Sequence, residues 1–327
     1  MTTYPISRGL MGTLRRAPKQ AVHAVDGVSF SLVRGGMLAL VGESGCGKTS
    51  IAQTVLRMVD PVSGTILFQG QDITKLTPKA LRPLRARMQM IYQDPYESLD
   101  PRFRVSSVLA EPLAIHEAGI SKADRRRRML DALERADMTP AELYVDRYPH
   151  ELSGGQRQRV AIAAGLILQP DLLVADEPVS MLDVSVRAGI LSLFDRLRRE
   201  GLGILMITHD LSTAAHFADR IAVMYLGRIL EEGTAREVVC DPQHPYTQAL
   251  LSVVPRRNPA DRNVPEILKG ETPSAVQVPS GCRFHPRCPQ AVPDCSAVDP
   301  QLGAANGAKA TDHLVACILA TSAALNR

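Results

Sequence analysis

The chain has 327 residues, enough for one large α/β domain and a smaller additional region. Hydrophobic residues make up 45% and charged residues 22%, an ordinary globular balance, and a formal net charge of +4 is too small to indicate nucleic-acid binding. No run reaches the about 20 consecutive apolar residues of a membrane-spanning helix, and residues 1–16 lack the apolar centre of a signal peptide. We therefore expect a soluble protein that stays on the side of the membrane where it is made.

Short apolar runs at 38–42, 172–175 and 204–208 are nearly continuous, as in strands that are buried on both faces of a parallel sheet. Helical patterns alternate with these runs. Residues 186–197, for example, place apolar side chains along one stripe of a helix. The alternation predicts an α/β fold of the βαβ type with helices on both sides of the sheet.

Helix-like, arginine-rich sequence interrupts this pattern after about residue 95. Ser121, with Asp124 three residues later, is placed to cap a helix whose apolar side includes Met129 and Leu133. Past about residue 240 prolines become frequent, so long helices and central strands are not expected there.

The strongest motif is a complete G-x-x-x-x-G-K-T pattern, formed by Gly42, Glu43, Ser44, Gly45, Cys46, Gly47, Lys48 and Thr49. An expected strand precedes it and a helix-compatible segment, 49–58, follows it. Glycines let backbone N–H groups surround phosphates closely, and the helix N-terminus adds the positive end of its dipole. Lys48 would contact the β- and γ-phosphates, and the Thr49 hydroxyl would hold Mg²⁺. The loop therefore predicts a nucleotide site; a chance glycine-rich turn is the alternative.

A second element of the site, a pair of acidic residues, follows the apolar run 172–175. Asp176 and Glu177 stand where a parallel strand ends, the edge at which open α/β sheets bind their ligands. Asp176 would hold Mg²⁺ through water, and Glu177 would polarise the attacking water. We read this pair as the second half of the phosphate site.

A third motif makes the set specific: Ser153, Gly154, Gly155 and Gln156 follow Leu152. Together with the two elements above, this sequence resembles the ABC ATPase family over roughly residues 20–250. Gln93 matches the family's Q-loop, residues 180–183 match its D-loop, and His209 matches its switch histidine.

The resemblance implies how these residues act. Two such domains close head to tail around two ATP molecules, so Lys48 and Thr49 of one subunit face Ser153 and Gly155 of the other. Gln93 is expected to contact Mg²⁺ or water and to mark the hinge to a helical insertion at about 95–165, which docks onto coupling helices of a membrane partner. His209 is expected to contact the γ-phosphate.

Two positions depart from the family pattern. Met181 stands in the D-loop where alanine is usual, and Thr49 with Ser50 follows the lysine where serine and threonine are more familiar. No aromatic residue for stacking on adenine is identified, and Tyr4 and His23 are only weak candidates.

The tail narrows the resemblance. Residues 244–251 and 279–289 are similar to the ATPase subunits of bacterial dipeptide and oligopeptide importers, which extends the match over nearly the whole chain. We therefore expect an ATPase domain in residues 1–250 and an importer-type C-terminal region in residues 251–327.

The six cysteines lack the context of a disulfide framework, and four of them lie in the tail, namely Cys282, Cys288, Cys295 and Cys317. Four thiolates suit a [4Fe–4S] cluster or a tetrahedral zinc. The long spacings and the resemblance favour the cluster; stray or buried thiols are the alternative. Cys240 is expected to be a buried apolar residue, and Cys46 to act through its backbone.

The sequence thus predicts an ATP-hydrolysing subunit that powers a dipeptide or oligopeptide importer from the cytoplasmic face of the membrane. Its expected partners are two permease subunits, a different second ABC ATPase and, indirectly, an extracytoplasmic binding protein, with no nucleic acid. A motor for nickel or glutathione import is the alternative from the same class. A soluble ABC ATPase of translation or DNA repair is the alternative from another class.

Overall fold

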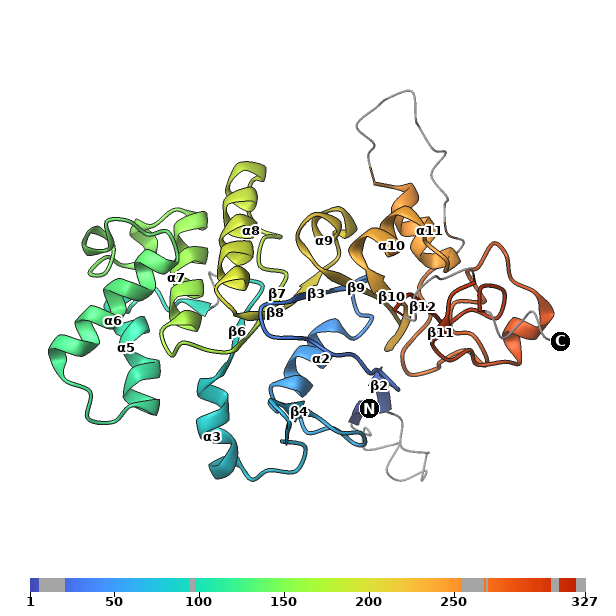
Figure 1. Cartoon of the computed structure of the whole chain (residues 1–327), viewed down its shortest axis with the longest axis horizontal. Helices are drawn as coiled ribbons and strands as arrows, with labels where there is room; N and C mark the ends of the chain where they lie inside the picture. Colours follow the sequence, from blue (N-terminus) through green and yellow to red (C-terminus); the bar gives the residue numbers. More distant parts are fainter. Residues whose placement is uncertain (6–20, 95–97, 255–267, 269, 307–311, 322–327) are drawn as a thin grey trace, which may run out of the picture. The chain divides into compact units, whose positions relative to one another are not determined.

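The computed structural model describes residues 1–5, 21–94, 98–254, 268, 270–306 and 312–321. It contains two compact units. The first unit comprises Met1–Ser31, Leu38–Leu67 and Thr208–Arg327, and the second comprises Leu32–Met37 and Phe68–Ile207. Figure 1 labels the helices and strands of both units.

The first unit is built on a mixed sheet with the strand order β11-β12-β10-β9-β3. Its strands are β3 (Met37–Val41), β9 (Arg220–Tyr225), β10 (Arg228–Thr234), β11 (Gly303–Ala304) and β12 (Leu314–Val315). Strands β3 and β9 are parallel, whereas β9, β10, β12 and β11 are antiparallel to their neighbours in that order. Every residue of β3 is buried, as its continuous apolar sequence predicts.

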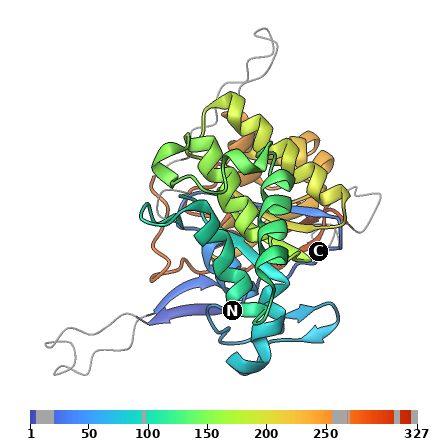
Figure 2. The ribbon, with the colours of Figure 1, turned by 90° about the vertical axis from the view of Figure 1, so that its left-hand side faces the viewer.

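A separate antiparallel pair, β1 (Thr2–Pro5) and β2 (Ala21–Val25), also belongs to this unit, and Figure 2 shows its two arrows side by side. Helix α2 packs on both strands of the pair, and helix α10 packs on β9 and β10. The unit's helices are α2 (Lys48–Val55), α9 (Leu211–Phe217), α10 (Ala235–Cys240), α11 (Pro245–Ser252) and the 3₁₀ turn η4 (Pro293–Ser296).

The second unit holds three parallel strands in the order β6-β7-β8, namely β6 (Met88–Ile91), β7 (Leu172–Asp176) and β8 (Gly203–Thr208). A small two-stranded sheet is formed by β4 (Leu67–Phe68) and β5 (Gln71–Asp72). The helices of this unit are α3 (Pro78–Ala86), α5 (Val105–His116), α6 (Lys122–Arg135), α7 (Gly154–Leu166) and α8 (Val184–Arg199), with 3₁₀ turns η1 (Ala141–Leu143) and η2 (Pro149–Glu151). Helices α5, α6 and α7 pack on one another, drawn in green in Figure 1.

Most elements agree with the sequence-based expectation. The three apolar runs are strands within one residue of the expected bounds, and Ser121 caps α6 by accepting a 3.0 Å hydrogen bond from the N–H of Asp124. The helix expected at 49–58 is shorter, because α2 ends at Val55 and Arg57 takes a positive φ of 53°. The antiparallel strands β10 to β12 were not expected, since a purely βαβ reading has no place for them.

Among the residues that the structure describes, no helix is both long and apolar enough to cross a membrane. The proline-rich tail behaves as its composition predicts, since its longest described helix, α11, has 8 residues.

Candidate ATP site

The Gly-rich loop lies in the first unit, between the buried strand β3 and helix α2. Gly47 caps the helix with a positive φ of 106°, and Lys48 is the first helical residue. The Lys48 ammonium donates hydrogen bonds to the carbonyl oxygens of Gly42, at 2.8 Å, and Glu43, at 2.9 Å. The loop therefore curves around the lysine, and Lys48 is only 5% exposed although it carries a charge. Thr49, the next residue, is exposed.

Packing against neighbouring strands requires glycine at two positions of the loop. A Cβ atom on Gly42 would lie 2.2 Å from the carbonyl oxygen of Met224 in β9, and one on Gly47 would lie 2.0 Å from that of Ala24 in β2. Both distances are shorter than any real contact, so no larger residue fits at either position without moving the backbone. The neighbouring strands thus determine the path of the loop.

Cys46 is a buried loop residue, and burial raises the pKa of its thiol. Its carbonyl oxygen accepts a 2.8 Å hydrogen bond from the N–H of Gly227, in the turn between β9 and β10. This contact holds the loop against the turn between β9 and β10, and the expected role of the Cys46 backbone at the phosphate site stays a prediction. Leu226 and Gly227 form that turn with φ values of 43° and 78°, the left-handed pair of a type I′ hairpin.

Glu43 makes a set of contacts that sequence reasoning missed. Its carboxylate accepts hydrogen bonds from both terminal nitrogens of Arg287, at 2.8 and 3.2 Å, and one from the Thr272 hydroxyl. Its N–H donates to the hydroxyl of Tyr246, at 3.1 Å. Burial acts to raise the pKa of Glu43, but the Arg287 and Thr272 contacts outweigh it and hold the pKa below its usual value. No local sequence signal links residues 244 positions apart.

The acidic pair of the second unit has the predicted setting. Asp176 ends β7 and is 6% exposed, and Glu177 follows it with a positive φ of 45°. The N–H of Glu177 donates to the carbonyl oxygen of Ile207 in β8, at 2.9 Å. The Gln93 amide donates a 3.1 Å hydrogen bond to the Glu177 carboxylate, so two residues predicted separately meet. The left-handed backbone fixes the direction in which Glu177 leaves the strand.

Residues 153–156 of the third motif, called the signature residues below, begin helix α7. Ser153 is its N-cap, and the side chains of Ser153 and Gln156 each accept a hydrogen bond from the other's N–H, at 3.3 and 2.9 Å. Ser153 itself is exposed at the helix end, where unpaired N–H groups favour an anion. Gly155 has a packing role that the motif did not reveal. A Cβ there would lie 2.4 Å from a Val186 methyl of α8.

The remaining predicted residues lie in turns or on the paired strands β1 and β2. Met181 of the D-loop is 60% exposed, and Asp183 caps α8 by accepting a 2.9 Å hydrogen bond from the N–H of Val186. In the first unit, His209 is exposed in the turn that leads into α9. Tyr4 and His23 lie on the paired strands β1 and β2, and the Tyr4 hydroxyl donates to the Gln53 side chain of α2, at 3.3 Å.

The four tail cysteines gather in the first unit. Cys282, Cys295 and Cys317 are buried and Cys288 is half-buried, and the N–H of Cys282 donates to the carbonyl oxygen of Cys295, at 2.8 Å. Burial raises the pKa of Cys282 to about 11, and the other three thiols add to the increase. Among the described residues, however, no three His, Cys, Asp or Glu side chains form a group that could hold a metal ion.

The burial expected for Cys240 is wrong. This residue is exposed rather than buried, because α10 ends there and buries only Ala235 and Val238.

A phosphate loop that opens a helix, a buried strand that ends in Asp-Glu, and a Ser-Gly-Gly-Gln helix start define an ATP-hydrolysing protein of the ATP-binding cassette class. The profile of the family described as "ABC transporter" matches residues 25–180, and that of "Oligopeptide/dipeptide transporter, C-terminal region" matches residues 230–295. This chain belongs to the ABC transporter family and carries the C-terminal region of its oligopeptide/dipeptide members.

Two curated relatives are similar to this chain over nearly its whole length. The dipeptide transport ATP-binding protein DppF of Escherichia coli is 46% identical over 315 residues, which cover 96% of this chain and 90% of the relative. The oligopeptide transport ATP-binding protein AppF of Bacillus subtilis is 46% identical over 320 residues, which cover 97% and 94%.

Solved structures of ATP-binding cassettes have the same fold. A dimeric post-hydrolysis state of the cassette MJ0796 with ADP and phosphate matches with a TM-score of 0.61 and 26% identity, covering 72% of this chain and 96% of that one. The cbiO1 protein of Clostridium perfringens matches with a TM-score of 0.61 and 30% identity, covering 67% and 84%.

Proposed function

We propose that this chain is the ATP-hydrolysing motor of an importer that carries dipeptides or oligopeptides across the cytoplasmic membrane. The observation that carries the proposal is the presence, in one chain, of a phosphate loop curved around Lys48 and of the C-terminal region found in oligopeptide/dipeptide transporters. The protein would act at the cytoplasmic face with two permease subunits and a second, different ABC ATPase. An extracytoplasmic binding protein would deliver the peptide to the permease.

In the proposed mechanism, the residues of the phosphate loop bind ATP, and Lys48 exchanges its loop carbonyls for phosphate oxygens. Mg²⁺, when bound, would neutralise charge on the β- and γ-phosphates, and Thr49 and Asp176 have the oxygen donors that it prefers. Glu177 orients the attacking water as a general base, and Gln93 holds its carboxylate in place through the amide hydrogen bond. His209 would contact the γ-phosphate.

The signature residues Ser153, Gly154, Gly155 and Gln156 would bind the ATP held by the partner ATPase. An exposed helix N-terminus capped by Ser153 supports this role, because its N–H groups and dipole favour phosphate. A site shared between two subunits makes closure of the pair depend on ATP, and hydrolysis then releases it.

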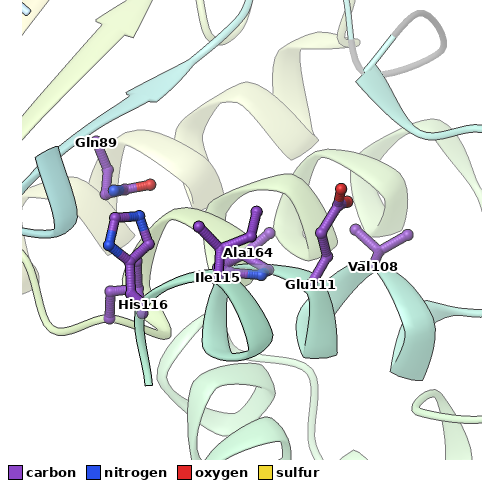
Figure 3. A pocket seen from close by; sticks show the side chains of 8 residues that line it. Gln89, Val108, Glu111, Ile115, His116 and Ala164 are labelled. Atoms are coloured by element: carbon purple, nitrogen blue, oxygen red, sulfur yellow. The ribbon is translucent and has the colours of Figure 1, made fainter. Parts of the chain in front are cut away.

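A pocket of about 300 Å³ in the second unit is our candidate for the permease contact. Helices α5 and α7 and strand β6 line it with mainly apolar side chains, and Figure 3 shows Gln89 and His116 at one side and Glu111 at the other. Burial and the Arg82 charge hold the pKa of His116 below its usual value, which favours the neutral ring, and Glu111 is the acidic side chain of the pocket. We propose as occupant a short permease helix with an apolar face and a basic residue opposite Glu111.

The tail cysteines Cys282, Cys288, Cys295 and Cys317 are proposed to hold a [4Fe–4S] cluster, with zinc as the alternative. The number and spacing of the cysteines and the burial of three of them support this proposal. The four side chains would have to converge further to hold the metal, because among the described residues no three of them form a metal-holding group. The division into an ATPase domain of residues 1–250 and a C-terminal region of residues 251–327 also stays a prediction.

Purification of the tagged protein from its native membranes in mild detergent tests the proposal. We expect two multi-span membrane proteins and a second ABC ATPase to accompany it, and an associated binding protein would identify the cargo class. A binding protein for nickel or glutathione would change the cargo but keep the importer. Ribosomal or DNA-repair partners without membrane subunits would refute the importer function.

A further inference from the structure

The C-terminal region makes direct contact with the phosphate loop. Arg287 lies one residue before Cys288, and its guanidinium pairs with both carboxylate oxygens of Glu43 inside the loop, at 2.8 and 3.2 Å. The Arg287 side chain is only 9% exposed and that of Glu43 is 26% exposed, so water screens this pair weakly. Removing one partner would therefore leave the other charge poorly solvated and unpaired, which costs more than the loss of a solvated surface pair.

Aromatic side chains fix the position of the arginine. The Arg287 guanidinium lies 5.8 Å from the centre of the Tyr225 ring, which also packs edge to face on Tyr246 and Phe284. All three rings are completely buried. The N–H of Arg287 donates to the carbonyl oxygen of Phe284, at 3.0 Å, so backbone turns of the tail also fix its place.

A second arginine of the tail contacts the turn between β9 and β10, which lies against the loop. Arg283 donates to the carbonyl oxygen of Leu226 and pairs with Asp26. The next residue, Gly227, accepts from the N–H of Asp26 and donates to the carbonyl oxygen of Cys46, both at 2.8 Å. Two tail residues four positions apart are therefore linked to the phosphate loop, Arg287 directly at Glu43 and Arg283 indirectly, through the turn that bonds to Cys46.

We propose that Arg287 is a positioning residue for ATP binding, because it neutralises Glu43 and thereby keeps Lys48 available for the phosphates. The Lys48 ammonium already donates a 2.9 Å hydrogen bond to the backbone carbonyl oxygen of Glu43, so the Glu43 carboxylate lies near the lysine, and the Lys48 charge contributes to its lowered pKa. Without Arg287, this carboxylate would attract the lysine and repel the nucleotide. The inference rests on the proposed role of residues 42–49 as the ATP phosphate site, and it makes the C-terminal region a determinant of nucleotide affinity.

The test measures the Kd of the full chain for the non-hydrolysable analogue AMP-PNP with Mg²⁺ by calorimetry. For Arg287→Gln we expect Kd to rise about five- to tenfold, the effect of removing one charge-assisted contact beside the site. The double variant Glu43→Gln with Arg287→Gln should regain most of this loss, because it also removes the unpaired carboxylate. A merely structural role of Arg287 predicts no such recovery.

Arg220→Gln is the matched control. Arg220 also pairs with a carboxylate, Glu232, and with the tail, through the Asp312 carbonyl oxygen. It lies opposite Leu38, at the end of β3 far from the loop, so its loss should leave Kd within about twofold of the wild-type value. Circular dichroism and thermal unfolding check that each variant is folded, and Arg287→Met, which also removes the charge, replaces Arg287→Gln if the latter is not.

Two outcomes overturn the inference. One is a Kd within twofold of wild type for the folded Arg287 variant, and the other is a loss that the Glu43→Gln change does not relieve. Lys48→Ala separates these from a failure of the proposed ATP site. If Lys48→Ala binds the analogue as tightly as wild type, the assignment of the loop is itself wrong.

Discussion

The Gln93 side-chain amide donates a 3.1 Å hydrogen bond to the carboxylate of Glu177, across 84 positions of sequence. Gln93 follows β6 and Glu177 follows β7, and these strands are parallel neighbours. The carboxyl ends of parallel neighbours meet at one edge of the sheet, which is why the two residues come together. The contact joins the Q-loop residue to the proposed general base.

Glu177→Gln should remove hydrolysis and keep ATP binding. The amide cannot accept a proton from water, so we expect kcat to fall about 100-fold or more with little change in nucleotide Kd. With ATP present, the variant should accumulate as a closed pair of ATPase subunits in size-exclusion chromatography. Hydrolysis at the wild-type rate would show that Glu177 is not the base.

Gly155→Ala should destabilise the second unit. The added methyl would lie 2.4 Å from Val186, so we expect the free energy of unfolding to fall by about 1–3 kcal/mol. Adding Val186→Ala makes room for the methyl and should restore most of the thermal stability. If ATPase activity stays low in the stable double variant, Gly155 is also needed next to phosphate; unchanged stability of the single variant would contradict the packing argument.

Ile115→Glu should weaken the contact with the permease without affecting nucleotide binding. Ile115 is 46% exposed and lines the pocket of α5 and α7. A charge there opposes an apolar partner and adds to that of Glu111. Leu143→Glu is the matched control, since Leu143 is an exposed apolar residue of the same unit outside the pocket. Equal recovery of permease subunits with Ile115→Glu and with wild type would exclude the pocket as the contact.

Iron, acid-labile sulfide and zinc should be assayed after anaerobic purification. We expect about four iron and four sulfide per chain, and loss of both in Cys282→Ser. Cys240→Ser serves as the control, because Cys240 is exposed at the end of α10. Zinc without sulfide would favour the alternative metal, and protein containing neither would refute a metal centre.

His313 should make stability depend on pH. Its ring nitrogen lies 2.8 Å from the buried carboxylate of Glu231, and this contact, with the charges of Glu237 and Asp241, raises the pKa of His313 above 6.5 against the effect of burial. Because the folded pKa is the higher one, this stabilisation is complete below about pH 6.5 and is lost as the pH rises through the folded value. Urea unfolding across this range should show the loss, and His313→Gln should abolish it. A wild-type pH dependence in His313→Gln would assign the effect to another group.

Local sequence was sufficient for the elements that depend on neighbouring residues. Continuous apolar runs predict the buried strands β3, β7 and β8. Short local motifs predict the Ser121 cap and the loop of residues 42–49, because these features depend only on residues close together in the sequence. The importer-type tail was also readable, because its motifs are continuous in the sequence, and the family comparisons confirm it.

Tertiary structure alone decided the contacts between distant segments. Val186 requires a small residue at position 155, and Arg287 pairs with Glu43. Both contacts depend on which surfaces meet after folding. The pairing of β12 with β10 is of the same kind, since two residues of strand carry too weak a pattern to be recognised. The sequence therefore determined the chemistry of the ATP site. Packing between segments far apart in the chain decided which neighbours hold the residues of this site in place. The sequence could not reveal these contacts, because no local periodicity or spacing signals a contact between distant segments.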